Sequence, residues 1–404
     1  MKYDFESIMD RRGMDAIAVD LLGKGDTSFV PAAPDEGYDI IPMWVADMNF
    51  PACPAIPKAI IERTGHPAYG YFDIRKEYYE EIIKWHESRN GVSGLTAECI
   101  GYENGVLGGV LSALGVFCSK GDNVLLHSPT YIGFTNSLTN SGYHIVHSPL
   151  KKDSDEIWRM DLEDMEEKIK SCHIHAALFC SPHNPCGRVW SREEILSFTE
   201  LCRKYDIRII SDEIWSDLVL HGRRHIPTQS VSEDAKNRTV ALYAPSKTFN
   251  LAGLVGSYHI IYNPAIRDRV RKESSLSHYN NINLLSMYAL IGAYSPEGYD
   301  WADELKQVLG QNIDYACAFI KERLPGVEVT KPEGTYMLFA DCTQYCKRTG
   351  KSLDDVLQAA WKVGVAIQDG RPFHGDCHTR INLALPLSRV KEAFDRFERY
   401  VFVD

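Results

Sequence analysis

Short apolar runs alternate with amphipathic stretches between about residues 100 and 260, a pattern typical of a parallel α/β sheet. Strands are predicted at residues 175–180, 207–210 and 239–243. Ser191 and Glu194 form an S-x-x-E capping box, which predicts a helix running to about Tyr205. The last hundred residues predict helices at 301–324 and from Ser388, and strands at 327–330 and 336–340. We therefore expect two domains: a large α/β domain (49–290) and a smaller α+β domain from both chain ends (1–48 and 291–404).

Polar clusters follow three of these strands, namely 181–188, 211–213 and 244–247. In open α/β sheets the carboxyl ends of the strands are where ligands bind. Nearer the N-terminus, residues 103–109 are rich in glycine and precede a helix predicted from Val110 to about Cys118. Amides at such a helix start, here those of Val106 and Leu107, can approach an anion closely, although a simple tight turn has the same pattern.

Composition narrows the class of protein. The 404 residues carry 44 Lys and Arg against 55 Asp and Glu, a formal charge of −11, which does not suit nucleic acid or anionic lipid. No run approaches the roughly 18 apolar residues of a membrane helix, and residues 1–13 do not resemble a signal peptide. The 11 cysteines include no CxxC pair, as expected of reduced thiols in a cytoplasmic protein. We expect a soluble, cytoplasmic protein with no nucleic-acid or membrane partner.

One cluster has metal-binding residue types. His374, Cys377 and His378 lie close together in the sequence, but no second ligand pair stands at a zinc-site spacing. The sequence therefore predicts no metal site.

The predicted strand ends carry a lysine, a carboxylate and an amide, and a helix start that can bind an anion lies nearby in the predicted fold. This combination suits pyridoxal phosphate. That cofactor needs a lysine for its Schiff base, an aspartate that keeps its pyridine nitrogen protonated, and a helix start for its phosphate. Lys247, Asp212 and the loop at Gly105 fit these three roles.

The motifs around these residues resemble those of the fold-type I pyridoxal phosphate enzymes, the class I and II aminotransferase superfamily. The matching runs are 181–188, 211–214 and 245–254, in the family's order. The resemblance implies an aspartate aminotransferase-like fold. It also implies that Asn184 bonds the phenolic oxygen of the cofactor and that Ser246 contacts its phosphate.

Residues 44–48 (WVADM), 66–71 (HPAYGY) and 250–254 further resemble the carbon–sulfur β-lyases of the MalY/PatB type. This likeness covers nearly the whole chain and implies a homodimer whose active site is shared between subunits. Tyr71 would reach the phosphate of the neighbouring subunit, and Tyr131 would stack on the cofactor ring. Arg380 would clamp the substrate carboxylate, in a substrate site that includes Ala46 and Asn184. Each tyrosine can instead be a core residue, and the arginine can serve a surface ion pair.

The sequence departs from the family at three positions. Val255 stands where many of these aminotransferases carry a phosphate-binding arginine, and Ala244 where they carry a serine. Asn49 replaces the aspartate that the subfamily tends to have. The phosphate would then rely on Ser246, on the amides near Val106 and Leu107, and on Tyr71, which predicts a modest affinity for the cofactor.

The resemblance implies a pyridoxal phosphate-dependent cystathionine β-lyase or cysteine-S-conjugate β-lyase. It would cleave L-cystathionine, L-cysteine or related S-substituted cysteines to a thiol, pyruvate and ammonia, with Lys247 as the base. An aminotransferase shares every cofactor residue and is the first alternative. The second alternative is a regulatory protein of the same fold that binds a transcription factor, since fold alone does not define function.

Overall fold

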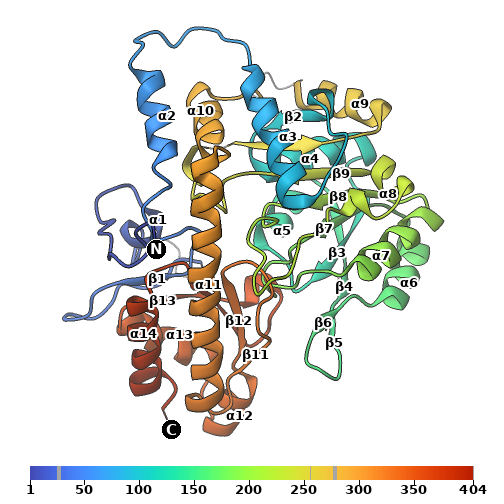
Figure 1. Cartoon of the computed structure of the whole chain (residues 1–404). Helices are drawn as coiled ribbons and strands as arrows, with labels where there is room; N and C mark the ends of the chain where they lie inside the picture. Colours follow the sequence, from blue (N-terminus) through green and yellow to red (C-terminus); the bar gives the residue numbers. More distant parts are fainter. Residues whose placement is uncertain (25–28, 255, 276–279, 404) are drawn as a thin grey trace. The chain divides into compact units, whose positions relative to one another are not determined.

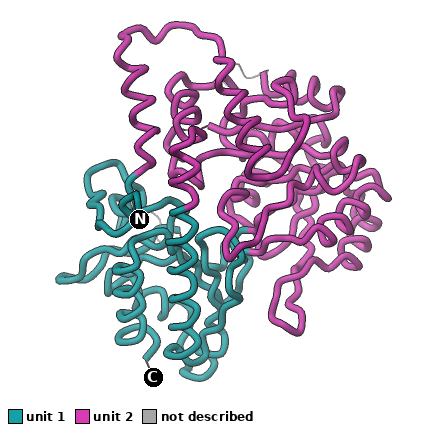
Figure 2. The backbone as a smooth tube through the Cα atoms, in the orientation of Figure 1, with its two compact units in different colours: residues 1–51, 184–187, 304–404 teal, residues 52–183, 188–303 magenta. Residues whose placement is uncertain are grey.

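The computed structural model describes residues 1–24, 29–254, 256–275 and 280–403. The chain forms two compact units (Figures 1 and 2). Unit 1 contains residues 1–51, 184–187 and 304–404, and unit 2 contains residues 52–183 and 188–303. Each unit is built around its own sheet.

Unit 2 holds a seven-stranded sheet in the order β2-β10-β9-β8-β7-β3-β4. The strands are β2 (Ile100–Glu103), β3 (Asn123–Ser128), β4 (His144–Pro149), β7 (Ile174–Cys180), β8 (Arg208–Asp212), β9 (Thr239–Tyr243) and β10 (Ser257–Ile260). β10 is antiparallel to both its neighbours, and the pairs from β9 to β4 are parallel. The predicted parallel sheet is confirmed. A separate short ribbon pairs β5 (Lys151–Lys152) with β6 (Trp158–Arg159).

Helices of unit 2 pack on its sheet or on one another (Figure 1). They are α2 (Ala55–Thr64), α3 (Lys76–Asn90), α4 (Gly105–Phe117), α5 (Ile132–Asn140), α6 (Leu162–Cys172), α7 (Arg192–Lys204), α8 (Glu233–Arg238), α9 (Pro264–Ser275) and α10 (Leu284–Ala293). The predicted capping box at the start of α7 is present, with the Glu194 amide 3.2 Å from Ser191 Oγ. The apolar side of α4 buries Val110 and Leu114 among sheet residues such as Leu242. Burying an aliphatic side chain contributes about 1.5–3 kcal/mol.

Unit 1 holds a five-stranded sheet in the order β1-β13-β14-β12-β11. Its strands are β1 (Ile41–Met43), β11 (Glu328–Val329), β12 (Met337–Asp341), β13 (Val365–Asp369) and β14 (His378–Asn382). Its helices are α1 (Ile17–Asp20), α12 (Thr343–Thr349), α13 (Leu353–Lys362) and α14 (Leu387–Arg396), and α11 (Pro296–Arg323) continues into it from residues of unit 2. Only the β1–β13 pair is parallel among these, so the unit has the mixed α+β pattern expected from the sequence.

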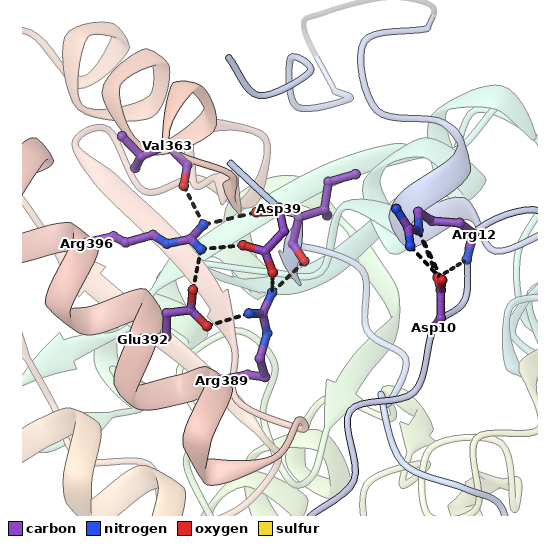
Figure 3. A network of polar contacts seen from close by, with 8 residues as sticks. Asp10, Arg12, Asp39, Val363, Arg389, Glu392 and Arg396 are labelled. Carbon is purple, nitrogen blue, oxygen red and sulfur yellow. Dashed lines mark hydrogen bonds and ion pairs between the residues drawn. The ribbon is translucent and has the colours of Figure 1, made fainter. Parts of the chain in front are cut away.

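Two arginines of α14 hold Asp39, two residues before β1, in place. Arg389 Nη2 lies 2.6 Å from Asp39 Oδ2, and Arg396 pairs with the other oxygen of the same carboxylate (Figure 3). Both arginines also pair with Glu392 on their own helix. Because Asp39 lies two residues before the strand that leads to residues 44–47, this network fixes where that segment begins.

No helix among the described residues is long and apolar enough to cross a membrane. Within the same residues, no group of three or more His, Cys, Asp or Glu side chains is arranged to hold a metal ion. All 11 cysteines are free thiols.

Candidate active site

Asp212 and Lys247 are placed by neighbouring parallel strands of unit 2. Asp212 is the last residue of β8 and pairs in register with Leu242 of β9. The sequence prediction ended this strand at Ile210, because two polar residues follow it; strand pairing carries it on to Asp212. β9 has the predicted bounds, and Lys247 is the fourth residue after its end. The two side chains therefore start from the same edge of the sheet.

The Asp212 carboxyl is almost fully buried, and Oδ1 accepts a hydrogen bond of 3.0 Å from the Ile214 amide. Burial raises its pKa to about 7, while that amide and the charge of Lys247 act to lower it. A buried carboxylate with a raised pKa is a group that a cation in the site would stabilise.

Lys247 is half-buried, and its Nζ lies 5.7 Å from the centroid of the Trp215 ring. An aromatic face attracts an ammonium group at this range. Trp215 is almost fully buried three residues after Asp212 and was not among the predicted site residues. Its place next to the lysine depends on the turn after β8, which no periodic pattern reveals.

Glu213, directly after Asp212, is the centre of a buried network that the sequence also did not predict. Its Oε2 accepts hydrogen bonds of 2.6 Å from both His225 Nε2 and Tyr243 OH. Oε1 accepts from Ser211 Oγ at 2.8 Å and from the Thr228 amide at 3.1 Å. This carboxylate thus ties the end of β8 to the end of β9 and to the segment around residue 225.

The start of α4 lies at the same edge of the sheet. β2 runs in the same direction as β9, because β10 is antiparallel to both, so the end of β2 leads into α4 on the edge that carries Lys247. The helix begins at Gly105, five residues before the predicted start, because packing overrides the low helix propensity of its glycines. A Cβ on Gly109 would lie 2.6 Å from Leu242 Cδ2, so glycine lets α4 approach β9.

The amides of Val106 and Leu107 belong to the first turn of α4. Gly105 has a φ of +72°, and a Cβ there would meet nothing within 4 Å. The N-cap residue Asn104 places no side-chain cap on the helix. First-turn amides have no acceptor inside a helix and carry the positive end of its dipole, so they suit an anion such as a phosphate.

Tyr131, directly before α5, follows the parallel strand β3. Its ring turns back over Gly133 and meets Phe134 edge-on, with 5.3 Å between the ring centroids. The side chain is half-buried, which leaves part of the ring accessible.

Ser246 and Tyr71 complete the predicted residues of unit 2. Ser246 is half-buried, and its backbone carbonyl accepts a hydrogen bond of 3.0 Å from the Leu251 amide. Tyr71 lies in the loop between α2 and α3 and its side chain is completely exposed. The structure therefore does not bring Tyr71 to the other residues of its unit.

In unit 1, the backbone of residues 44–47 is held by side chains from the sheet. The Tyr336 hydroxyl donates to the Ala46 carbonyl at 3.0 Å. Asn382 Nδ2 donates to the carbonyls of Val45 and Asp47, both at 2.6 Å. Arg380 Nη2 donates to the Trp44 carbonyl at 2.9 Å. The carbonyls of four consecutive residues, 44–47, thus each accept a hydrogen bond. These bonds fix the backbone at Ala46, within the WVADM segment (44–48).

Arg380 of β14 is almost fully buried. Its Nη1 lies 3.5 Å from Asn184 Oδ1, so two of the predicted substrate residues meet. The guanidinium carbon stands 4.2 Å from the centroid of the Phe373 ring. A guanidinium fixed between a carbonyl, an amide and an aromatic face is preorganised to bind a carboxylate.

Two of the three departures from the family are described by the structure. Asn49 Oδ1 accepts a hydrogen bond of 3.0 Å from Arg11 Nη1, and Arg11 Nη2 pairs with Asp47 at 2.6 Å. An aspartate at position 49 would add a second charge to Arg11, whereas Asn49 leaves Asp47 as its ion-pair partner. Ala244 is buried in the core of the sheet. Val255 lies outside the described residues.

These residues fit pyridoxal phosphate. A buried Asp212 carboxylate stabilised by a cation suits a protonated pyridine nitrogen, the uncapped start of α4 suits a phosphate, and Lys247 suits an aldehyde carbon.

Comparison with known proteins agrees with this chemistry. The family "Aminotransferase class I and II" matches residues 38–397. The cystathionine β-lyase PatB of Bacillus subtilis is 34% identical over 363 residues, covering 89% of this chain and 92% of the relative. The crystal structure of a pyridoxal phosphate-bound C–S lyase from Staphylococcus hominis has a TM-score of 0.88 at 29% identity, covering 100% of this chain and 99% of that chain. A pyridoxal phosphate-bound putative aminotransferase from Clostridium difficile has a TM-score of 0.89 at 32% identity, covering 98% and 99%.

The chain therefore belongs to the aminotransferase class I and II family and has its pyridoxal phosphate-dependent fold. Within that family it is a pyridoxal phosphate-dependent enzyme of the carbon–sulfur lyase type.

Proposed function

We propose that the protein is a carbon–sulfur β-lyase that cleaves L-cystathionine, or a closely related S-substituted cysteine, to a thiol, pyruvate and ammonia. The observation that carries the proposal is the buried Asp212 at the end of β8 with Lys247 following the neighbouring strand. Similarity over 89% of the chain to a protein named cystathionine β-lyase supports the substrate class.

The residues of unit 2 would carry the chemistry. Pyridoxal phosphate, when bound, supplies the electron sink that stabilises negative charge at the substrate α-carbon. Lys247 removes the α-proton as a general base, a step that typically contributes about a hundred- to ten-thousand-fold. Asp212 accepts a hydrogen bond from the protonated ring nitrogen, which keeps that nitrogen cationic. The amides of Val106 and Leu107, together with Ser246, bind the phosphate, and Tyr131 stacks on the ring.

The residues of unit 1 would bind the amino acid. Arg380 holds the substrate carboxylate through two parallel hydrogen bonds. Asn184 has two roles: it bonds the phenolic oxygen of the cofactor and helps to orient Arg380. Ala46 would line the substrate site, on a strip of backbone that the four carbonyl contacts fix.

The reaction balances without a further reactant except water. The Cα–H electron pair becomes the Cα=Cβ double bond, and the Cβ–S pair leaves with sulfur. The thiolate takes up the proton that Lys247 removed. Water then hydrolyses the released three-carbon enamine to pyruvate and ammonia, and the thiol is homocysteine when the substrate is cystathionine.

A homodimer and a cytoplasmic location are part of the proposal. The free thiols of all 11 cysteines support a reducing compartment. The fully exposed Tyr71 supports a second chain, because a tyrosine that reaches the phosphate of a partner has to point away from its own unit.

The test measures pyruvate and homocysteine released from L-cystathionine by the purified protein with pyridoxal phosphate and no 2-oxo acid. Lys247→Ala should abolish the release. Lys236→Ala is the matched control, because Lys236 Nζ also lies over an aromatic ring of unit 2, 4.7 Å from the centroid of Tyr262. Full activity in Lys247→Ala would refute the role of this lysine. No release by the wild type, with amino-group transfer to an added 2-oxo acid, would establish an aminotransferase.

A further inference from the structure

Asn280 bonds three consecutive residues at the start of α4. Its Oδ1 accepts the Asn104 amide at 2.8 Å. Its Nδ2 donates to the Tyr102 carbonyl at 2.9 Å and to Glu103 Oε2 at 3.2 Å. Asn280 stands four residues before α10, so its side chain connects the segment leading to α10 with the end of β2 and the N-cap of α4.

Glu103, one of the groups that Asn280 contacts, is itself held firmly in place. Its carboxylate is fully buried, and Oε1 lies 2.8 Å from Nδ1 of the buried His259 on β10. Oε2, which Asn280 also contacts, accepts Ser112 Oγ of α4 at 3.0 Å. A Cβ on Gly101 would lie 2.3 Å from His259 Nε2, so the imidazole is enclosed by β2 as well. The acceptor for Asn280 is therefore held by two strands and by α4 itself.

The bond to Asn104 determines how the helix begins. Asn104 is the N-cap, and its φ and ψ of −75° and 76° direct the chain into Gly105. Gly105, with a φ of +72°, tolerates many conformations, because glycine has no Cβ to restrict it. A hydrogen bond to the amide just before such a residue limits the directions that the following amides can take. Asn280 is then what keeps the first turn of α4 in one orientation.

We propose that Asn280 is a positioning residue for the phosphate of pyridoxal phosphate: it orients the amides of Val106 and Leu107 without touching the cofactor. The inference rests on the proposed role of α4 in holding the phosphate. Because Val255 stands where related enzymes carry a phosphate-binding arginine, backbone amides would supply more of the phosphate binding here, and their orientation matters more.

The experiment titrates cofactor-free protein with pyridoxal phosphate and, separately, with pyridoxal, which lacks the phosphate, and follows the absorbance of the bound ligand. Asn280→Ala should raise the Kd for pyridoxal phosphate about tenfold, roughly the loss of one hydrogen bond. The Kd for pyridoxal should change less than about twofold, because that ligand does not use the amides. Asn280→Asp tests the same point with little change in size: it keeps the acceptor but places a second carboxylate beside Glu103.

The matched control is Asn283→Ala. Asn283 lies three residues further along and caps α10 through the Leu285 amide at 2.9 Å, so its loss lowers thermal stability without reaching α4. An unchanged Kd for pyridoxal phosphate in Asn280→Ala, an equal loss of affinity for both ligands, or the same loss in Asn283→Ala would overturn the proposal. A wild type that binds the two ligands equally well would instead refute the role of α4 in phosphate binding.

Discussion

The ring of Tyr131 occupies the space that a side chain at Gly133 would need. A Cβ on Gly133 would lie 2.3 Å from Cε1 and 2.6 Å from Cζ of the tyrosine ring. Carbon atoms in contact are about 3.5–4.0 Å apart, so both groups cannot stay in place. Gly133 is the second residue of α5, and glycine is less favourable than alanine in a helix by up to about 1 kcal/mol. Gly133 therefore makes the helix less stable than alanine would, but it leaves room for the ring of Tyr131.

Gly133→Ala should separate cofactor binding from stability. The new methyl group displaces the Tyr131 ring, so we expect the Kd for pyridoxal phosphate to rise about tenfold, since an aromatic contact contributes about 0.5–1.5 kcal/mol. Thermal stability should stay level or increase, because alanine favours the helix. Absorbance titration and thermal unfolding of the cofactor-free protein measure the two effects.

The control is a double-mutant cycle with Tyr131→Ala. If Gly133→Ala acts through the ring, it adds nothing once the ring is gone, and the double variant binds like Tyr131→Ala alone. Additive losses of affinity would show that Gly133 matters for another reason.

The raised pKa of Asp212 predicts how the cofactor-free protein responds to pH. Its pKa is about 7 in the folded chain against an ordinary 3.8. Between these values the Asp212 carboxyl keeps a proton in the folded state that it has lost in the unfolded state, so its contribution to the free energy of unfolding falls as the pH rises from about 4 to 7. The full difference amounts to about 4 kcal/mol. Urea unfolding across this range should show the free energy of unfolding of the wild type falling relative to that of Asp212→Asn.

Saturation with pyridoxal phosphate should reduce that fall. A cationic ring nitrogen beside Asp212 favours the ionised carboxylate and lowers its pKa. If the wild type shows the same pH dependence with and without cofactor, Asp212 does not face the ring nitrogen.

Local sequence predicted the elements that carry Asp212 and Lys247 well. β9 has its predicted bounds, and the capping box of α7 is formed by the predicted pair. Apolar runs of strand length and side-chain caps depend on nearby residues, so a single sequence reveals them. The start of α4 was placed too late because the stabilising contact of Gly109 with Leu242 joins residues far apart in the chain.

The supporting contacts could not be predicted for the same reason. Glu213 meets His225 and Tyr243 only once two strands are paired; the polar cluster at 211–213 marks the strand end but not these partners. Asn382 reaches residue 45 across 337 positions of sequence. The domain boundaries at residues 48 and 290 stay predictions about independently folding parts of the chain.

Glu213→Gln should strongly destabilise the protein. Burial acts to raise the pKa of Glu213, but His225, Tyr243 and Ser211 outweigh it, and the pKa lies below its usual range. The glutamine replaces the charged acceptor that His225, Tyr243 and Ser211 share, and each buried group left without its partner costs about 1–3 kcal/mol. Because the folded pKa is lowered, this stabilisation is present above about pH 4.5 and is lost as the pH falls below it. Urea unfolding at pH 7 and at about pH 3 measures both effects; an equal loss at the two values would contradict an ionised Glu213.

Mixing two inactive variants tests whether Tyr71 and Lys247 of different chains form one site. Tyr71 is fully exposed, so Tyr71→Ala should fold as stably as the wild type while losing cofactor affinity and activity. When it is co-expressed with Lys247→Ala, half of the dimers are mixed, and in each of these one of the two sites carries neither substitution. The mixture should therefore recover about a quarter of wild-type pyruvate release. Activity no greater than that of the two variants measured separately would mean that Tyr71 does not complete the site of a partner.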